Sequence, residues 1–155
     1  MSTNVRDYTL EDLESVKACL VLLQEFNTLV DPHRLEGIEI ANEYLHNLLK
    51  TCEKNNGKIF VAEDGGKIVG MIAVVIHNQH DKLKPHGAIT DLIVLPEYRD
   101  KGVGKNLINK AEKYIKDSGI DIIQASVLSP LIKAQHMYTR NGYEEYEMIL
   151  RKRLK

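Results

Sequence analysis

An arginine and two glycines separate an apolar stretch from an amphipathic stretch within residues 88–114. The apolar run ends at Pro96, which cannot donate to a sheet ladder, so the run predicts a short strand. Arg99, Gly102 and Gly104 follow, and apolar residues then recur at helical spacing. A helix N-terminus leaves backbone N–H groups unpaired and carries partial positive charge, and glycine places no Cβ in front of them. The stretch therefore predicts a phosphate-binding turn.

Two common nucleotide-binding motifs do not fit these glycines. A dinucleotide fingerprint needs a third glycine where this chain has Leu107. A P-loop needs serine or threonine after its Gly-Lys pair, and this chain has Asn106 there. A tight strand-to-helix turn that binds no ligand is also compatible with the two glycines alone.

A third pattern does fit. Residues Arg99 to Gly104 resemble the (Arg/Gln)-x-x-Gly-x-(Gly/Ala) signature of the GNAT N-acetyltransferases, which bind acetyl-coenzyme A. The segment Ala134 to Tyr143 resembles a second pattern of that family, A-x-x-(Phe/Leu)-Tyr-x-x-x-Gly-(Phe/Tyr). Leu131 departs from the family, because many members carry an asparagine at this position. Two signatures in the family's order indicate a GNAT N-acetyltransferase.

The resemblance implies acetyl-CoA as co-substrate and suggests how the chain holds it. Backbone N–H groups from Arg99 through Lys105 would bind the pyrophosphate, and the strand before Pro96 would pair with the pantetheine arm. A backbone N–H near Val94 would polarise the thioester carbonyl. The implied cofactor-binding residues are Ile93, Val94, Leu95, Arg99, Asp100, Lys101, Gly102, Val103, Gly104 and Lys105.

Tyr138 matches the tyrosine that donates a proton to the departing thiolate in many GNAT enzymes. A tyrosine hydroxyl has a pKa of about 10 and is protonated at neutral pH, so it can serve as a general acid. A core aromatic residue on an amphipathic helix is the alternative interpretation. The base that deprotonates the amine is less defined, with His86, Thr90 and Asp91 as candidates on the central strand. Threonine is a poor base, so we expect His86, or a water molecule held by Thr90, to serve.

The remaining pattern predicts one α/β domain, residues 1–155, with a mixed central sheet flanked by helices. Apolar spacing and turn residues give the order β-α-α-β-β-β-α-β-α-β, which matches the GNAT fold. Strands are expected at residues 5–8, 58–63, 67–76, 122–127 and 143–150, in addition to the one before Pro96. Helices are expected from Thr9 to about residue 28, over residues 38–53, after Gly102, and from Ser129 with Pro130 in its first turn.

The amino-acid composition limits the binding partners and the cellular location that we expect for this protein. The formal net charge of −1 gives no electrostatic reason to expect nucleic acid or an anionic membrane as a partner. No apolar run approaches the roughly 20 residues that span a bilayer. Two cysteines and no apolar leader predict buried, reduced thiols in a cytoplasmic protein. Three histidines near residues 77–86 lack carboxylate or cysteine support, so no metal is expected.

The resulting hypothesis is an N-acetyltransferase that acts on the primary amine of a small molecule. Acetylation of a protein or peptide amine is one alternative, and an acetyl-CoA sensor without turnover is another. The loop at residues 30–37 and the connection at residues 77–85 should select the acceptor, but their mixed charges do not indicate its class. The family resemblance also allows a homodimer.

Overall fold

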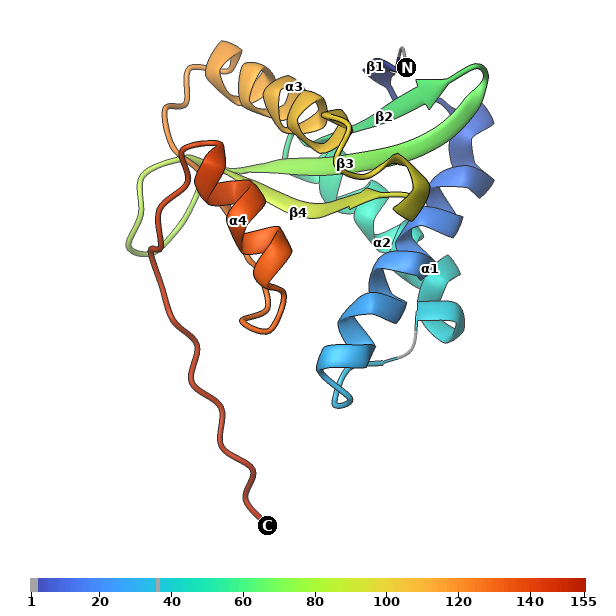
Figure 1. The fold of residues 1–155 in the computed structure, drawn as a ribbon. Helices are drawn as coiled ribbons and strands as arrows, with labels where there is room; N and C mark the ends of the chain where they lie inside the picture. The colour runs from blue at the N-terminus through green and yellow to red at the C-terminus, as the bar shows by residue number, and fades with distance from the viewer. Residues whose placement is uncertain (1–2, 36) are drawn as a thin grey trace.

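The computed structural model describes residues 3–35 and 37–155, and its centre is one five-stranded mixed sheet (Figure 1). The strands lie in chain order: β1 (Asn4–Asp7), β2 (Lys58–Asp64), β3 (Lys67–His77), β4 (His86–Val94) and β5 (Ile123–Ala125). All neighbours pair antiparallel except β4 and β5, which are parallel. That exception follows from the helical crossover between them, as the sequence predicted.

Helices cover both faces of the sheet. Helices α1 (Leu13–Val30) and α2 (Gly37–Lys54) pack on one face, and α3 (Val103–Asp117) and α4 (Ile132–Arg140) pack on the other. Short 3-10 helices at Leu10–Asp12 (η1) and Pro96–Tyr98 (η2) precede α1 and α3. Strand β3 is buried at every position from Ile68 to Ile76, because both of its faces carry a helical layer. The predicted mixed sheet with flanking helices is confirmed.

Two predicted boundaries near the end of the fold need correction. Helix α4 begins at Ile132, because Ser129 and Pro130 instead form a turn that the Leu131 N–H closes on the Leu128 carbonyl at 2.9 Å. The strand expected over residues 122–127 forms ladder pairs only over Ile123–Ala125. Among the described residues, this short pairing leaves the later part of β4 without a neighbouring strand on that side.

The strand expected over residues 143–150 is wrong. Tyr143 packs against the body, with its N–H donating to the Tyr138 carbonyl at 3.0 Å, and Arg151 donates to Asp31 at 2.9 Å. Residues 144–155, here called the terminal segment, then run away from the body without regular secondary structure (Figure 1). An alternating apolar pattern forms a strand only beside another strand, and none within residues 3–35 and 37–155 lies next to this segment.

A β-bulge interrupts the pairing of β3 with β4. Ala73 faces Asp91 but Val74 faces Ile89, so Thr90 is the extra residue. Because side chains alternate along a strand, the bulge turns Asp91 to the face covered by α1 and α2. Ile93, two residues later, accordingly packs in the core under those two helices. Without the bulge, strict alternation would place His86 and Thr90 on one face of the strand and Asp91 on the other.

Both cysteines are buried, as expected, and neither forms a disulfide. Burial raises the pKa of the Cys19 and Cys52 thiols to about 11, which keeps both protonated and unreactive at neutral pH. Across the described ranges, no helix combines the length and the apolar character that a membrane crossing requires.

Candidate active site

The second half of β4 has an unpaired edge. The Leu95 N–H donates to the Val69 carbonyl of β3 at 2.9 Å. Because donors alternate in direction along a strand, the N–H groups of Leu92 and Val94 point away from β3. Strand β5 pairs with β4 only as far as Ile89, so no other strand in the described part of the chain covers these donors. An extended molecule carrying amide groups could therefore pair with this edge.

The turn after β4 presents further backbone donors at the start of α3. Asp100 and Gly102 both adopt left-handed backbone conformations, with φ of 59° and 83°. The Asn106 N–H makes the first helical hydrogen bond, to the Gly102 carbonyl, at 3.0 Å. The N–H groups of the intervening first turn consequently have no partner within the helix and carry its positive dipole end.

Gly104 brings this helix start close to β4 and α4. A Cβ added there would lie 3.1 Å from Met137 Sδ and 3.8 Å from Val94 Cγ2. The first turn of α3 therefore lies next to the end of the open edge. The two sets of backbone donors form one continuous region.

The basic side chains around the turn have different environments. Arg99 donates from Nε to the Val94 carbonyl at 2.9 Å, and its guanidinium lies 4.6 Å from the centre of the Phe26 ring. It thus ties the end of β4 to α1. Lys101 donates to the Glu97 carbonyl at 3.1 Å, whereas Lys105 is exposed at the helix start. Of the three, Lys105 is the cation best placed to meet a bound anion.

Tyr138 lies on α4 with only 9% of its surface exposed, and its ring packs edge-on against Tyr143 at 5.2 Å. Burial raises the pKa of its hydroxyl, and the negative charge of Asp91 raises it further. The hydroxyl is therefore protonated across the physiological pH range and can act only as a proton donor in that range.

Asp91 is a carboxylate buried in the middle of the fold, with 4% of its surface exposed. Tyr44 of α2 donates from its hydroxyl to Asp91 Oδ1 at 2.6 Å. The second oxygen, Oδ2, has no hydrogen-bond partner within the described residues. Burial raises the pKa of Asp91, and the hydrogen bond from Tyr44 opposes that rise. A buried carboxylate oxygen without a partner is costly, which marks this position as a functional candidate.

His86 occupies the opposite end of β4 from Val94. It is buried, with Nδ1 3.0 Å from the Lys84 carbonyl oxygen, and its ring packs against His77 and His80 at centroid distances of 5.2 and 5.7 Å. Eight residues of strand separate it from Val94, or about 26 Å at about 3.3 Å per residue. The structure therefore does not bring His86 to the open edge.

The structure adds two residues that sequence reasoning missed, Tyr44 and Phe26. Tyr44 contacts the site only because the bulge turns Asp91 toward α2. A carboxylate within an otherwise apolar strand was the available signal, and it pointed to Asp91 but not to its partner.

Comparison with known proteins identifies the architecture. The sequence pattern of the acetyltransferase (GNAT) family matches residues 22–143. The chain is 31% identical to an uncharacterised N-acetyltransferase of Methanocaldococcus jannaschii over 94% of its own length and 62% of that protein. It is 26% identical to the aminoalkylphosphonate N-acetyltransferase of Salmonella typhimurium, over 91% of this chain and 84% of that protein.

A solved structure shows the same fold at low sequence identity. AAC(6′)-Iy, in complex with the bisubstrate analog CoA-S-monomethyl-acetylneamine, superimposes with a TM-score of 0.74 at 17% identity, covering 100% of this chain and 99% of that one. The chain spans 50–62% of the length of three curated relatives that it matches, so it corresponds to only part of those proteins. Because the family pattern extends over most of the sequence, the chain belongs to the acetyltransferase (GNAT) family.

Proposed function

We propose that this chain, acting as a single domain, transfers an acetyl group from acetyl-CoA to a primary amine of a small molecule, by direct attack within a ternary complex. The observation that carries the proposal is the continuity between the open edge of β4 and the first turn of α3. Acetyl-CoA joins an extended arm with two amides to a pyrophosphate. That combination needs a strand edge next to an anion-binding helix start.

The residues expected to bind acetyl-CoA fall into two groups, one along the edge of β4 and one at the start of α3. Ile93 to Leu95 would align the pantetheine arm, with the Val94 N–H free to polarise the thioester carbonyl. The N–H groups from Gly102 to Lys105 would hold the pyrophosphate. Arg99 would act on the edge through its hydrogen bond to the Val94 carbonyl.

Tyr138 would protonate the leaving group. The amine nitrogen attacks the thioester carbonyl carbon, the carbon–sulfur bond breaks, and the Tyr138 hydroxyl proton passes to the departing sulfur. Its raised pKa keeps the hydroxyl protonated before the sulfur leaves, and it also makes the hydroxyl a weaker acid than a free phenol.

We assign the base to Asp91 in place of the expected His86. Asp91 Oδ2 has no other described partner and could take the proton that the attacking amine loses. The raised pKa of Asp91 makes its carboxylate a stronger base than an exposed one. His86 lies at the far end of β4, where its Nδ1 is close to the Lys84 carbonyl oxygen.

The names of related proteins favour a small acceptor. The Salmonella relative is named for an aminoalkylphosphonate, and the AAC(6′)-Iy structure carries an analog that joins CoA to an acetylneamine. Both names specify small amines, which supports the small-molecule reading over a protein acceptor.

Tyr138→Phe tests the proposal. Thiol release from acetyl-CoA across a panel of small amines should fall about 10²- to 10⁴-fold in kcat, the usual contribution of a general acid. Protection against thermal unfolding by acetyl-CoA should persist. Tyr143→Phe is the matched control, since it removes a neighbouring hydroxyl that donates to Glu112 at 3.3 Å.

Two results would contradict the proposal in different ways. Acetyl-CoA that gives no thermal protection to the wild-type chain would exclude the binding assignment. Strong protection without thiol release from any small amine or peptide would favour a non-catalytic acetyl-CoA sensor.

A further inference from the structure

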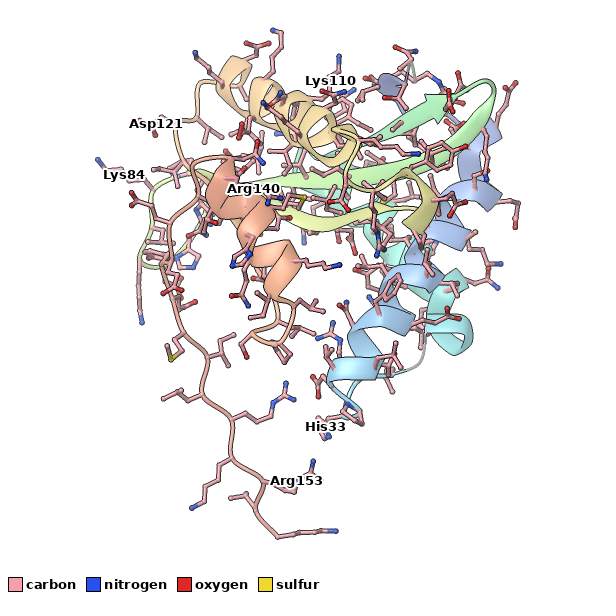
Figure 2. All side chains as sticks on the ribbon, in the orientation of Figure 1. His33, Lys84, Lys110, Asp121, Arg140 and Arg153 are labelled. Atoms are coloured by element: carbon pink, nitrogen blue, oxygen red, sulfur yellow. The ribbon has the colours of Figure 1, made fainter. Side chains whose placement is uncertain are left out.

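The connection between α1 and α2, described over residues 31–35, contains one carboxylate, and that carboxylate is already engaged. Asp31 accepts hydrogen bonds from Arg151 at 2.9 Å and from the His33 backbone N–H at 3.3 Å, and its side chain is only 13% exposed. Figure 2 shows His33 of this connection in the same part of the molecule as Arg153 of the terminal segment. Arg151 therefore neutralises the negative charge of Asp31.

Arg34 is the cation that this pairing leaves behind. Its backbone N–H donates to the Asp31 carbonyl at 3.1 Å, but none of the ion pairs among the described side chains includes its guanidinium. Arg34 Nε is buried and has no hydrogen-bond partner within the described residues, while the residue as a whole is half-buried. A buried donor without an acceptor is costly, which marks Arg34 as a binding candidate.

The charges of Arg34 and Asp91 both act on Tyr44. Arg34 precedes α2, which begins at Gly37, and Tyr44 lies about two turns into that helix. The Tyr44 hydroxyl donates to Asp91 Oδ1 at 2.6 Å, and Asp91 Oδ2 has no described partner. Burial and the charge of Asp91 raise the pKa of Tyr44, whereas the charge of Arg34 lowers it. Two opposite charges thus lie close to one hydroxyl, and each has a polar atom without a partner.

Given the proposed function, on which this step rests, we propose that the acceptor amine also carries a carboxylate or phosphonate, which Arg34 binds while the amine lies against Asp91. An alkyl amine arrives as an ammonium ion, because its pKa is about 10, and so complements a carboxylate. A guanidinium presents paired N–H donors that match two oxygens of such an anion. A molecule with opposite charges at its two ends therefore satisfies both sites. Arg151 contributes by holding Asp31, which would otherwise compete for Arg34.

Amines of different charge test this preference. Thiol release from acetyl-CoA is measured with amino carboxylates, aminoalkylphosphonates, plain alkylamines and diamines. Each class covers the same series of chain lengths, because the span between Arg34 and Asp91 sets the best length. We expect kcat/KM to be highest for an anionic class, and the carboxylate and phosphonate series show which anion the site takes.

Arg34→Gln should lower the ratio of kcat/KM between anionic amines and alkylamines about 10- to 150-fold, the effect of losing one hydrogen bond between charged groups. The loss should lie mainly in KM, because the anion is remote from the reacting carbonyl. Arg34→Lys, which keeps the charge, should retain part of the preference. Arg140→Gln is the matched control, since it removes an exposed arginine at the end of α4, and it should leave the ratio unchanged.

The role of Arg151 is tested through Asp31. Arg151→Gln releases Asp31 to pair with Arg34, so the KM of the anionic amines should rise. The double variant Asp31→Asn/Arg151→Gln should recover the KM of the wild type, which a purely structural role of Arg151 would not produce. A double variant without recovery would overturn the part assigned to Arg151.

Binding of the reaction products separates this proposal from the proposed function, because it needs no turnover. In calorimetric titrations with CoA present, N-acetylated aminoalkylphosphonate or amino carboxylate should bind more tightly than N-acetylated alkylamine, and Arg34→Gln should remove the difference. Tight, Arg34-dependent binding without thiol release from any amine would contradict the proposed function alone. Equal kcat/KM for anionic and neutral amines, or a preference that survives Arg34→Gln, would overturn the proposed role of Arg34 while leaving the acetyl transfer intact.

Discussion

A comparison of the single variants Gly102→Ala and Gly119→Ala separates the effect of a glycine on folding from its effect on acetyl-CoA binding. The two glycines flank α3, one at each end, with φ of 83° and 80°. An added Cβ meets nothing within 4 Å at either position. Both substitutions should therefore incur only the penalty of a left-handed backbone, about 1–2 kcal/mol. That is equivalent to a fall in Tm of about 2–8 °C for a chain of this size.

Only Gly102→Ala should weaken acetyl-CoA binding. Its Cβ would stand at the N-terminal end of the helix, where under the proposed function the first-turn N–H groups would meet the pyrophosphate. Losing one hydrogen bond to a charged group costs about 1.5–3 kcal/mol, so Kd should rise about 10- to 150-fold. Gly119→Ala should leave Kd unchanged, because it lies at the other end of the helix.

Calorimetric titration with acetyl-CoA, together with thermal unfolding of the free proteins, measures both effects. Equal losses of stability and a large difference in Kd are expected. If the two variants bind acetyl-CoA equally well, the pyrophosphate does not lie at the start of α3, and the central assignment is wrong.

Two further predictions concern carboxylates. Asp91→Asn should lower kcat far more than His86→Gln in the thiol-release assay while leaving acetyl-CoA binding intact, and the reverse order would restore His86 as the base. Asp91→Asn should not lower Tm, because the raised pKa of Asp91 means that folding disfavours its charged form. Asp12→Asn should reduce the free energy of unfolding by about 1–2 kcal/mol at neutral pH, because the ion pair with Arg6 at 2.8 Å lowers the pKa of Asp12 to about 2. The difference in the free energy of unfolding between wild type and variant should be largest above the ordinary pKa near 3.8 and should vanish as pH falls through about 2. A difference that persists at pH 1 would contradict this prediction.

The backbone features were the most predictable from the sequence. Gly102 and Gly104 located the turn before α3. Gly70 in β3 lies where the backbone of β4 approaches closely, because a Cβ added there would lie 2.9 Å from the Ile93 carbonyl oxygen. Glycine is informative in these places because its absence of a side chain is itself the requirement.

Two features escaped prediction because they depend on distant partners. The bulge at Thr90 arises from a register difference between β3 and β4, which no local pattern encodes. The terminal segment has the alternation of a strand, but a strand forms only beside another strand, and none of the described strands lies next to it.

The difference between backbone contacts and side-chain contacts explains why the sequence indicates the family more readily than the acceptor amine. Backbone N–H groups along β4 and at the start of α3 are available for the cofactor, and they constrain the sequence mainly through glycine and strand pattern. Under the proposed function, side chains on the α1 and α2 face, with the hydrogen-bonded pair Tyr44 and Asp91 among them, would face the amine. Backbone N–H groups tolerate many side chains but require glycine at particular positions, so a backbone-built cofactor site leaves a recognisable sequence pattern. Variation at residues near Tyr44, and not in the glycine turn, should therefore change which amine is acetylated.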